Sequence, residues 1–168
     1  MINDRTAVKD EVTFQTGKGM VDNLNMFGFF EAKLFDKFGG LKECRKVPNL
    51  VTTLGHKMAA DQILAAPAVA TPGWMEVGTG TGQSAGDATL LSYISESRKA
   101  LDAKTRVSTV VTMSCTMGAG IGTGAITEAG IFNVVSQNTT DLICYADFAV
   151  INKGADDSLG ISWTLTFG

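Results

Sequence analysis

The chain contains few of the residue types that build most catalytic and metal sites. Its 168 residues include one histidine, His56, and three cysteines, Cys44, Cys115 and Cys144, which lie far apart and form no CxxC motif. An odd number of widely spaced cysteines predicts free, mostly buried thiols, as in a protein assembled in a reducing cytoplasm. We therefore expect neither a zinc site nor a nucleophile–histidine set, and no catalytic, cofactor-binding or metal-binding residue is predicted.

Charge and long hydrophobic runs are also scarce. Charged residues make up 18% of the chain, the formal net charge is −3, and no run of Lys and Arg exceeds two residues. Nucleic-acid binding is not expected, because phosphate contacts need a clustered basic surface. No apolar run reaches the roughly 18 residues of a membrane span, so no membrane partner is expected. The N-terminus has no apolar stretch after its first charges, so no secretory signal is expected either.

The clearest pattern that is present lies at the C-terminal end of the chain. Large apolar residues alternate there with hydroxyl residues. Successive side chains of a strand point to opposite faces, so the alternation predicts a closing strand with a buried apolar face. The apolar residues are Ile161, Trp163, Leu165 and Phe167. We expect Trp163 and Phe167 to be buried.

Similar alternation recurs through the second half of the chain. It predicts single strands over 106–114 and 126–135, and a strand over 142–151 that is apolar on both faces. Residues 28–47 are predicted to form two extended pieces around the turn Gly39-Gly40. Residues 89–100 fit a strand or a helix, and Tyr93 and Ile94 favour a strand. The predicted fold is mainly β, an antiparallel β-sandwich or barrel with one short helix and an extended N-terminal arm.

One helix is predicted after Pro48. Asn49 is a suitable N-cap, and Leu50, Leu54 and Met58 belong to an apolar stripe at helical spacing that continues to about residue 66. His56 lies off this stripe, so we expect it to face solvent.

The N-terminal residues have no regular period. We divide the chain into an arm over 1–27 and a single β-rich domain over 28–168. Val12 and Phe14 fit one short strand, and Val21 and Leu24 are too apolar for a free tail. We therefore expect the arm to dock, either on its own domain or on a neighbouring subunit.

Two glycine-rich loops invite comparison with phosphate-binding loops. Residues 78–82 and 118–124 lack the lysine and the following helix that a P-loop needs, so both are predicted to be structural turns. Glu128 lies in an otherwise apolar strand and is predicted to be buried and paired with Arg98 or Arg106. Asp156 and Asp157 are predicted to be solvated turn residues.

Several blocks of sequence together resemble a known group of proteins. The blocks are PNLVT at 48–52 with AAD at 59–61, WMEVGTG at 74–80 with GDATL at 86–90, ITEAGIFN at 126–133, and the ending at 151–167. Together they resemble small structural proteins of tailed-bacteriophage virions, described as tail-fibre-like or as head-decoration (cement) proteins. The resemblance runs from about residue 46 to the end, and residues 1–45 match nothing in that group.

The resemblance implies a non-enzymatic virion protein. The favoured hypothesis is a capsid decoration protein that stabilises the head by contacts with the major capsid protein or other virion subunits. We expect a homo-oligomer, for which a closed trimer at three-fold positions is the economical symmetry. The alternative is a tail, collar or tail-fibre component, or an adaptor involved in host attachment. A carbohydrate- or nucleotide-processing enzyme is the third and least favoured hypothesis. The implied location is the virion, after assembly in the host cytoplasm.

Overall fold

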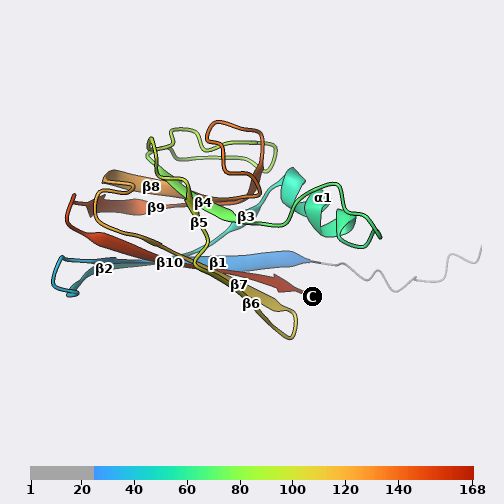
Figure 1. The fold of residues 1–168 in the computed structure, drawn as a ribbon, viewed down its shortest axis with the longest axis horizontal. Coiled ribbons are helices and arrows are strands. Elements are labelled where there is room, and N and C mark those ends of the chain that lie inside the picture. The colour runs from blue at the N-terminus through green and yellow to red at the C-terminus, as the bar shows by residue number, and fades with distance from the viewer. Residues whose placement is uncertain (1–24) are drawn as a thin grey trace, which may run out of the picture.

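The computed structural model describes residues 25–168, which form two antiparallel sheets packed face to face (Figure 1). Sheet A has the strand order β2-β1-β10-β7-β6, and sheet B has the order β3-β9-β8-β4-β5. The mainly β, two-layer prediction is therefore confirmed. The predicted arm over 1–27 lies outside the described residues except for its last three positions, and two of these, Met26 and Phe27, already belong to β1.

Sheet A is built from both ends of the described chain. Its strands are β1 (Met26–Phe35), β2 (Leu41–Pro48), β6 (Ala103–Val107), β7 (Val110–Met117) and β10 (Ser158–Phe167). The closing strand β10 lies between β1 and β7, so it is central in the sheet. The backbones of Asn25 and Gly168 exchange two hydrogen bonds of 2.9 and 3.1 Å, which fixes the start of the described chain beside its end.

Sheet B contains β3 (Leu50–Val51), β4 (Trp74–Gly78), β5 (Lys99–Ala100), β8 (Gly124–Phe132) and β9 (Leu142–Lys153). Residues 142–146 of β9 are all buried, so the prediction of a strand covered on both faces is confirmed for this half, whereas Asp147, Ala149 and Val150 in the second half are exposed. One of these faces packs against sheet A. The other lies beneath the loops of residues 79–98 and 133–141, which Figure 1 shows above β8 and β4.

The core lies between the sheets and is centred on aromatic contacts. Trp163 of β10 is fully buried and meets the ring of Phe30 edge-on, with centroids 5.1 Å apart. Phe30 also stacks at 4.8 Å on Phe148 of β9, so one aromatic residue joins the two sheets. The prediction for Trp163 is confirmed, whereas Phe167 is only partly buried at the open end of the sandwich.

The one helix of residues 25–168 is shorter than predicted. Helix α1 covers Thr53–Asp61 and is capped by Thr52, whose hydroxyl accepts the N–H of Gly55 at 3.1 Å. The prediction of Asn49 as the N-cap was wrong, because Leu50 and Val51 pair with β9 as a strand. A Cβ on Gly55 would lie 2.4 Å from the carbonyl oxygen of Ile143, so a glycine here allows the helix to approach β9 closely. His56 is exposed, as predicted.

Two other predicted elements differ from the structure. The strand predicted over 106–114 is instead a tight hairpin, in which β6 turns into β7 through Ser108 and Thr109, and Ser108 has a left-handed φ of 51°. Residues 89–100 form neither a long strand nor a helix, apart from a bridge at Tyr93 and the two-residue strand β5. Within residues 25–168, no helix is long and apolar enough to cross a membrane.

Candidate functional site

The loops over sheet B enclose a buried charged cluster centred on Arg98. Its guanidinium lies 2.8 Å from Oε2 of Glu76 and 3.0 Å from Oδ2 of Asp141, and all three side chains are less than a tenth exposed. The same group lies 3.6 Å above the ring of Phe132 and donates to backbone carbonyls of the 133–141 loop. Gln137 adds a hydrogen bond to Glu76. These contacts tie the loops to β4 and β8, so the arrangement serves a structural role.

Glu128 lies at the centre of a second buried polar contact. Its carboxylate accepts the backbone N–H groups of Gly80 at 2.9 Å, Ser92 at 2.8 Å and Leu91 at 3.2 Å. The predicted pairing with Arg98 or Arg106 was wrong, because Arg98 binds Glu76 and Asp141, and Arg106 donates to the carbonyl of Ser108. One backbone amide of the 78–82 loop, that of Gly80, binds an anion together with the amides of Leu91 and Ser92, and that anion is the protein's own carboxylate.

The glycines of this loop are needed for the contact with Glu128. A Cβ at Gly78 would lie 2.4 Å from Oε1 of Glu128, and one at Gly80 would lie 2.7 Å from it. Larger residues would therefore push the loop off the carboxylate. The glycines predicted a turn at 78–82. The three amides that donate to Glu128 could not be predicted, because they lie 36 to 48 residues away from it in sequence.

Asp157 belongs to a third polar contact, in the loop between β9 and β10. Its carboxylate accepts from Nζ of Lys42 at 2.7 Å and from the N–H of Gly154 at 2.8 Å, and both contacts hold its pKa below the usual range. The prediction of a solvated turn carboxylate was wrong for Asp157, although Asp156 is exposed. Nearby, Lys153 donates to the carbonyl of Gly118 at 2.9 Å, and burial lowers the pKa of this lysine.

The cysteines are free thiols, as predicted, but they differ in accessibility. Cys115 and Cys144 are buried, and burial raises the pKa of Cys115 to about 11 and that of Cys144 to about 12. Cys44 is exposed on β2. Among residues 25–168, no group of three or more His, Cys, Asp or Glu side chains has the geometry to hold a metal ion.

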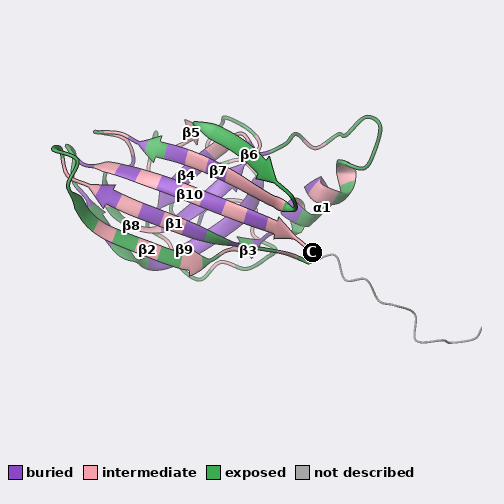
Figure 2. Cartoon of the chain, turned by 90° about the horizontal axis from the view of Figure 1, so that it is seen from below, coloured by how far each residue is buried: buried purple, intermediate pink, exposed green. Residues whose placement is uncertain are grey.

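Within residues 25–168, the outer face of sheet A has no covering layer. Figure 2 views the molecule from this side, where no loop or helix of these residues crosses the strands. Hydroxyl residues of β10 and β7 pair directly across it, with Ser162 opposite Ser114 and Thr164 opposite Thr112. On the adjacent strand β1, Phe27 and Phe29 are 52% and 47% exposed. We call this surface the hydroxyl face; it comprises the outward residues of β1, β10 and β7.

The hydroxyl face has a shallow hollow beside its aromatic edge. The hollow has a volume of about 120 Å³ and is lined by Phe29, Glu31, Lys46, Ser162 and Thr164. The ammonium of Lys46 lies 5.6 Å from the centre of the Phe29 ring. A surface of hydroxyl groups with an aromatic edge suits contact with another protein, because hydroxyl groups cost less to desolvate than charges and aromatic rings supply apolar area.

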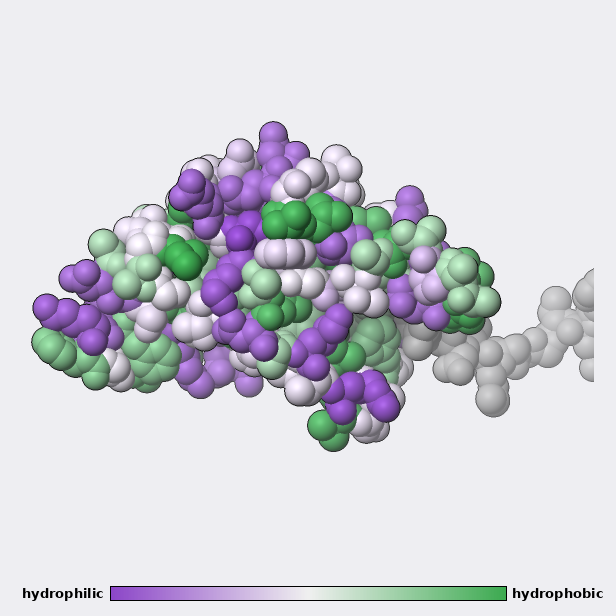
Figure 3. Space-filling model, in the orientation of Figure 1, coloured by the Kyte–Doolittle hydropathy of each residue, from purple (hydrophilic) through white to green (hydrophobic). Residues whose placement is uncertain are grey.

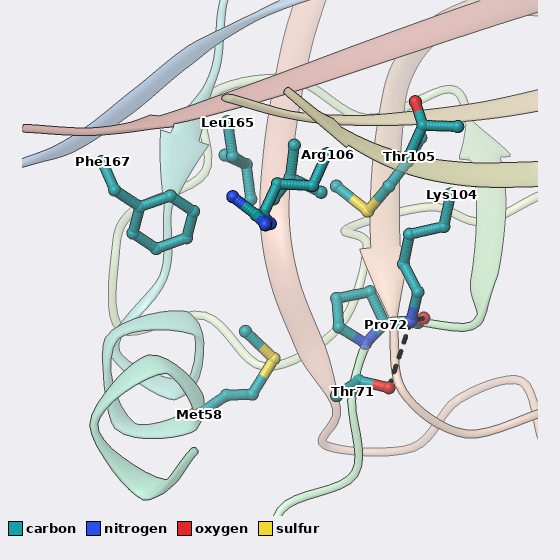
Figure 4. A pocket seen from close by; sticks show the side chains of 10 residues that line it. Met58, Thr71, Pro72, Lys104, Thr105, Arg106, Leu165 and Phe167 are labelled. Atoms are coloured by element: carbon teal, nitrogen blue, oxygen red, sulfur yellow. Dashed lines mark hydrogen bonds between the residues drawn. The ribbon is translucent and has the colours of Figure 1, made fainter. Parts of the chain in front are cut away.

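An apolar groove opens where the two sheets diverge, between α1 and β6 (Figure 4). Its volume is about 290 Å³, and Met58, Pro72, Leu165 and Phe167 point into it. Lys104 crosses one side and donates to the carbonyl of Pro72 at 3.0 Å and to the hydroxyl of Thr71 at 3.2 Å. Figure 3 shows further hydrophobic side chains gathered over α1 and the loop after it, where Ile63 and Leu64 are exposed.

The groove and the hydroxyl face were not predicted as sites. The alternation of β10 separated the apolar residues from the hydroxyl residues correctly, but strand order decides which hydroxyl residues become neighbours. No family model matches the chain, and comparisons with curated proteins and with solved structures gave no match.

Proposed function

We propose that this chain is a non-enzymatic structural subunit of a tailed-bacteriophage virion, and that it decorates the head by binding capsid subunits through the hydroxyl face. The observation that carries the proposal is this broad face, which residues 25–168 leave open, on the opposite side of the sandwich from the loops that cover sheet B. The resemblance of residues 46–168 to small virion proteins supports the same function.

The chemistry of the hydroxyl face suits binding by area. The outward residues of β10 and β7 are uncharged, and on β1 the charges of Glu31 and Lys33 pair with each other at 3.0 Å, so docking requires few unpaired charges to be removed from water. Phe27 and Phe29 supply apolar anchors at one edge. A stable protein contact buries roughly 1,600 Å² in total, and many equivalent contacts on a particle add through avidity.

The buried charges have structural partners that are consistent with a rigid subunit. Arg98 holds two loops against sheet B, and Glu128 holds the 78–82 loop against the segment at 91–92. A stiff scaffold loses little conformational freedom on docking, which favours binding.

The test is to compare particles assembled with and without this protein. Loss of resistance to heat or osmotic shock, with the subunit located on the head by electron microscopy, is the expected result. If heads without the protein are equally robust but the particles fail to adsorb to the host, head decoration is wrong and the tail or attachment function takes its place.

A further inference from the structure

The two edges of sheet A are protected differently. Strand β2 forms one edge, and Arg45 on it donates to the carbonyls of Ala149 and Val150 on β9, both at 3.2 Å. This contact closes the sandwich on that side. Strand β6 forms the other edge, and all five of its residues are exposed. An exposed edge strand carries unpaired backbone groups that can accept a further strand.

The exposed edge runs beside the apolar groove. The inward residues of β6 are Lys104 and Arg106, which pair across the sheet with Met113 and Val111 and help to line the groove. Neither cation forms a salt bridge within residues 25–168. An added strand that fits this edge would therefore present apolar side chains to the groove and a carboxylate to the cations.

Residues 10–14 of this chain have that pattern. Their sequence is Asp-Glu-Val-Thr-Phe, so a strand places Asp10, Val12 and Phe14 on one face and Glu11 and Thr13 on the other. We propose that residues 10–14 dock in the groove of their own domain, as an added strand on β6, with Val12 and Phe14 in the groove and Asp10 beside its cations.

The connection has the required length. Asn25 is fixed to Gly168, directly after the groove residue Phe167. The sheet order places β6 three strands from β1, so an added strand lies roughly 20 Å across the sheet. Residues 15–24 can span roughly 35 Å when extended. A tether of this length gives its own segment an effective concentration in the millimolar range, which favours it over a second copy.

Charge also disfavours pairing of two β6 edges. The strand contains Lys104 and Arg106 and no acidic residue, so a second copy of the same edge would bring like charges together. The acidic residues next to Val12 complement the edge instead. The inference does not rest on the proposed virion function, because it concerns the isolated chain.

Hydrogen exchange of the full chain tests the docking. The β6 amides that do not face β7 should be protected in the native protein, and Phe14→Asp should remove that protection. Thr13→Asp is the matched control, since its side chain points away from the groove and protection should remain. Unprotected edge amides in the native protein, unchanged protection in Phe14→Asp or equal loss in both variants would overturn the proposal.

The same measurement at several protein concentrations identifies the donor of the segment. Protection by the chain's own residues 10–14 does not change on dilution. Protection that disappears on dilution would overturn docking within one chain and assign the groove to a second copy.

Discussion

The backbone N–H of Gly80 lies 2.9 Å from Oε1 of Glu128, and this contact closes a glycine loop around a buried carboxylate. The loop and the carboxylate are 48 residues apart in sequence, so the contact joins two distant parts of the sheet B layer. The glycine loop that resembles an anion-binding loop thus donates its Gly80 amide to a carboxylate of the same chain.

Replacing Glu128 should destabilise this layer. Glu128→Gln puts an amide group, which donates, where one of the acceptor oxygens stood, and it leaves a buried N–H without a partner. The free energy of unfolding should fall by about 1–3 kcal/mol in urea denaturation. Glu31→Gln is the matched control, because its ion pair with Lys33 is partly exposed and screened by solvent, so its loss should change the free energy of unfolding little. Equal stabilities of the two variants would contradict the role given to Glu128.

Trp163 should contribute more to stability than any exposed aromatic residue. It is fully buried against Phe30, so Trp163→Ala loses apolar contacts and leaves a cavity that costs about 3–5 kcal/mol. Phe38→Ala, at a side chain that is 87% exposed, should leave the unfolding midpoint nearly unchanged. An unchanged melting temperature for Trp163→Ala would contradict the placement of β10 in the core.

The sequence predicted the strands where one alternation fills a whole element. In β10 the buried residues Ile161, Trp163 and Leu165 keep one parity throughout. In β8 the register shifts between Ile126 and Glu128, so Ile126 joins the core between the sheets whereas Glu128 faces the loops. The sequence predicted a strand over 126–135 but not this change of face, because a bulge inserts one residue without changing the apolar pattern.

Local sequence also did not predict where the helix starts or where β6 turns into β7. Leu50 and Val51 fit a helical stripe as well as a strand, and pairing with β9 decides between them. Alternation continues from Val107 to Val111 across the turn, which contains neither glycine nor proline. The hydroxyl face and the groove depend on strand order, which periodicity does not specify.

Stability in acid should depend on Asp157. Hydrogen bonds from Lys42 and Gly154 lower its pKa in the folded state, so the unfolded chain binds more protons at this site in mildly acidic solution. Its contribution is therefore present above the unfolded pKa of about 3.9 and is lost as the pH falls through the folded value. Asp157→Asn should flatten the pH dependence of unfolding below about pH 4. An identical acid profile for variant and native protein would contradict this ion pair.

One thiol should react in the folded chain. Cys44 is exposed, whereas burial raises the pKa values of Cys115 and Cys144 to about 11 and about 12. The thiolate is the reactive form, so a disulfide reagent near neutral pH should modify Cys44 alone. Cys44→Ser should abolish the fast reaction, and denaturant should expose the two remaining thiols. Rapid modification of folded Cys44→Ser would show that the core opens readily.

The hydroxyl face should determine binding to the particle. Phe29 is 47% exposed on this face, so Phe29→Asp should preserve the fold while placing a charge in the proposed contact. Val135→Asp is the matched control, because Val135 is 59% exposed on a loop over sheet B, away from the hydroxyl face. Each variant is added to particles that lack the protein, and the bound fraction is measured after sedimentation. Phe29→Asp should lose most of its binding and Val135→Asp should retain it. Loss of binding by Val135→Asp alone would show that the loops over sheet B form the contact. Equal binding by both variants would exclude Phe29 from the interface.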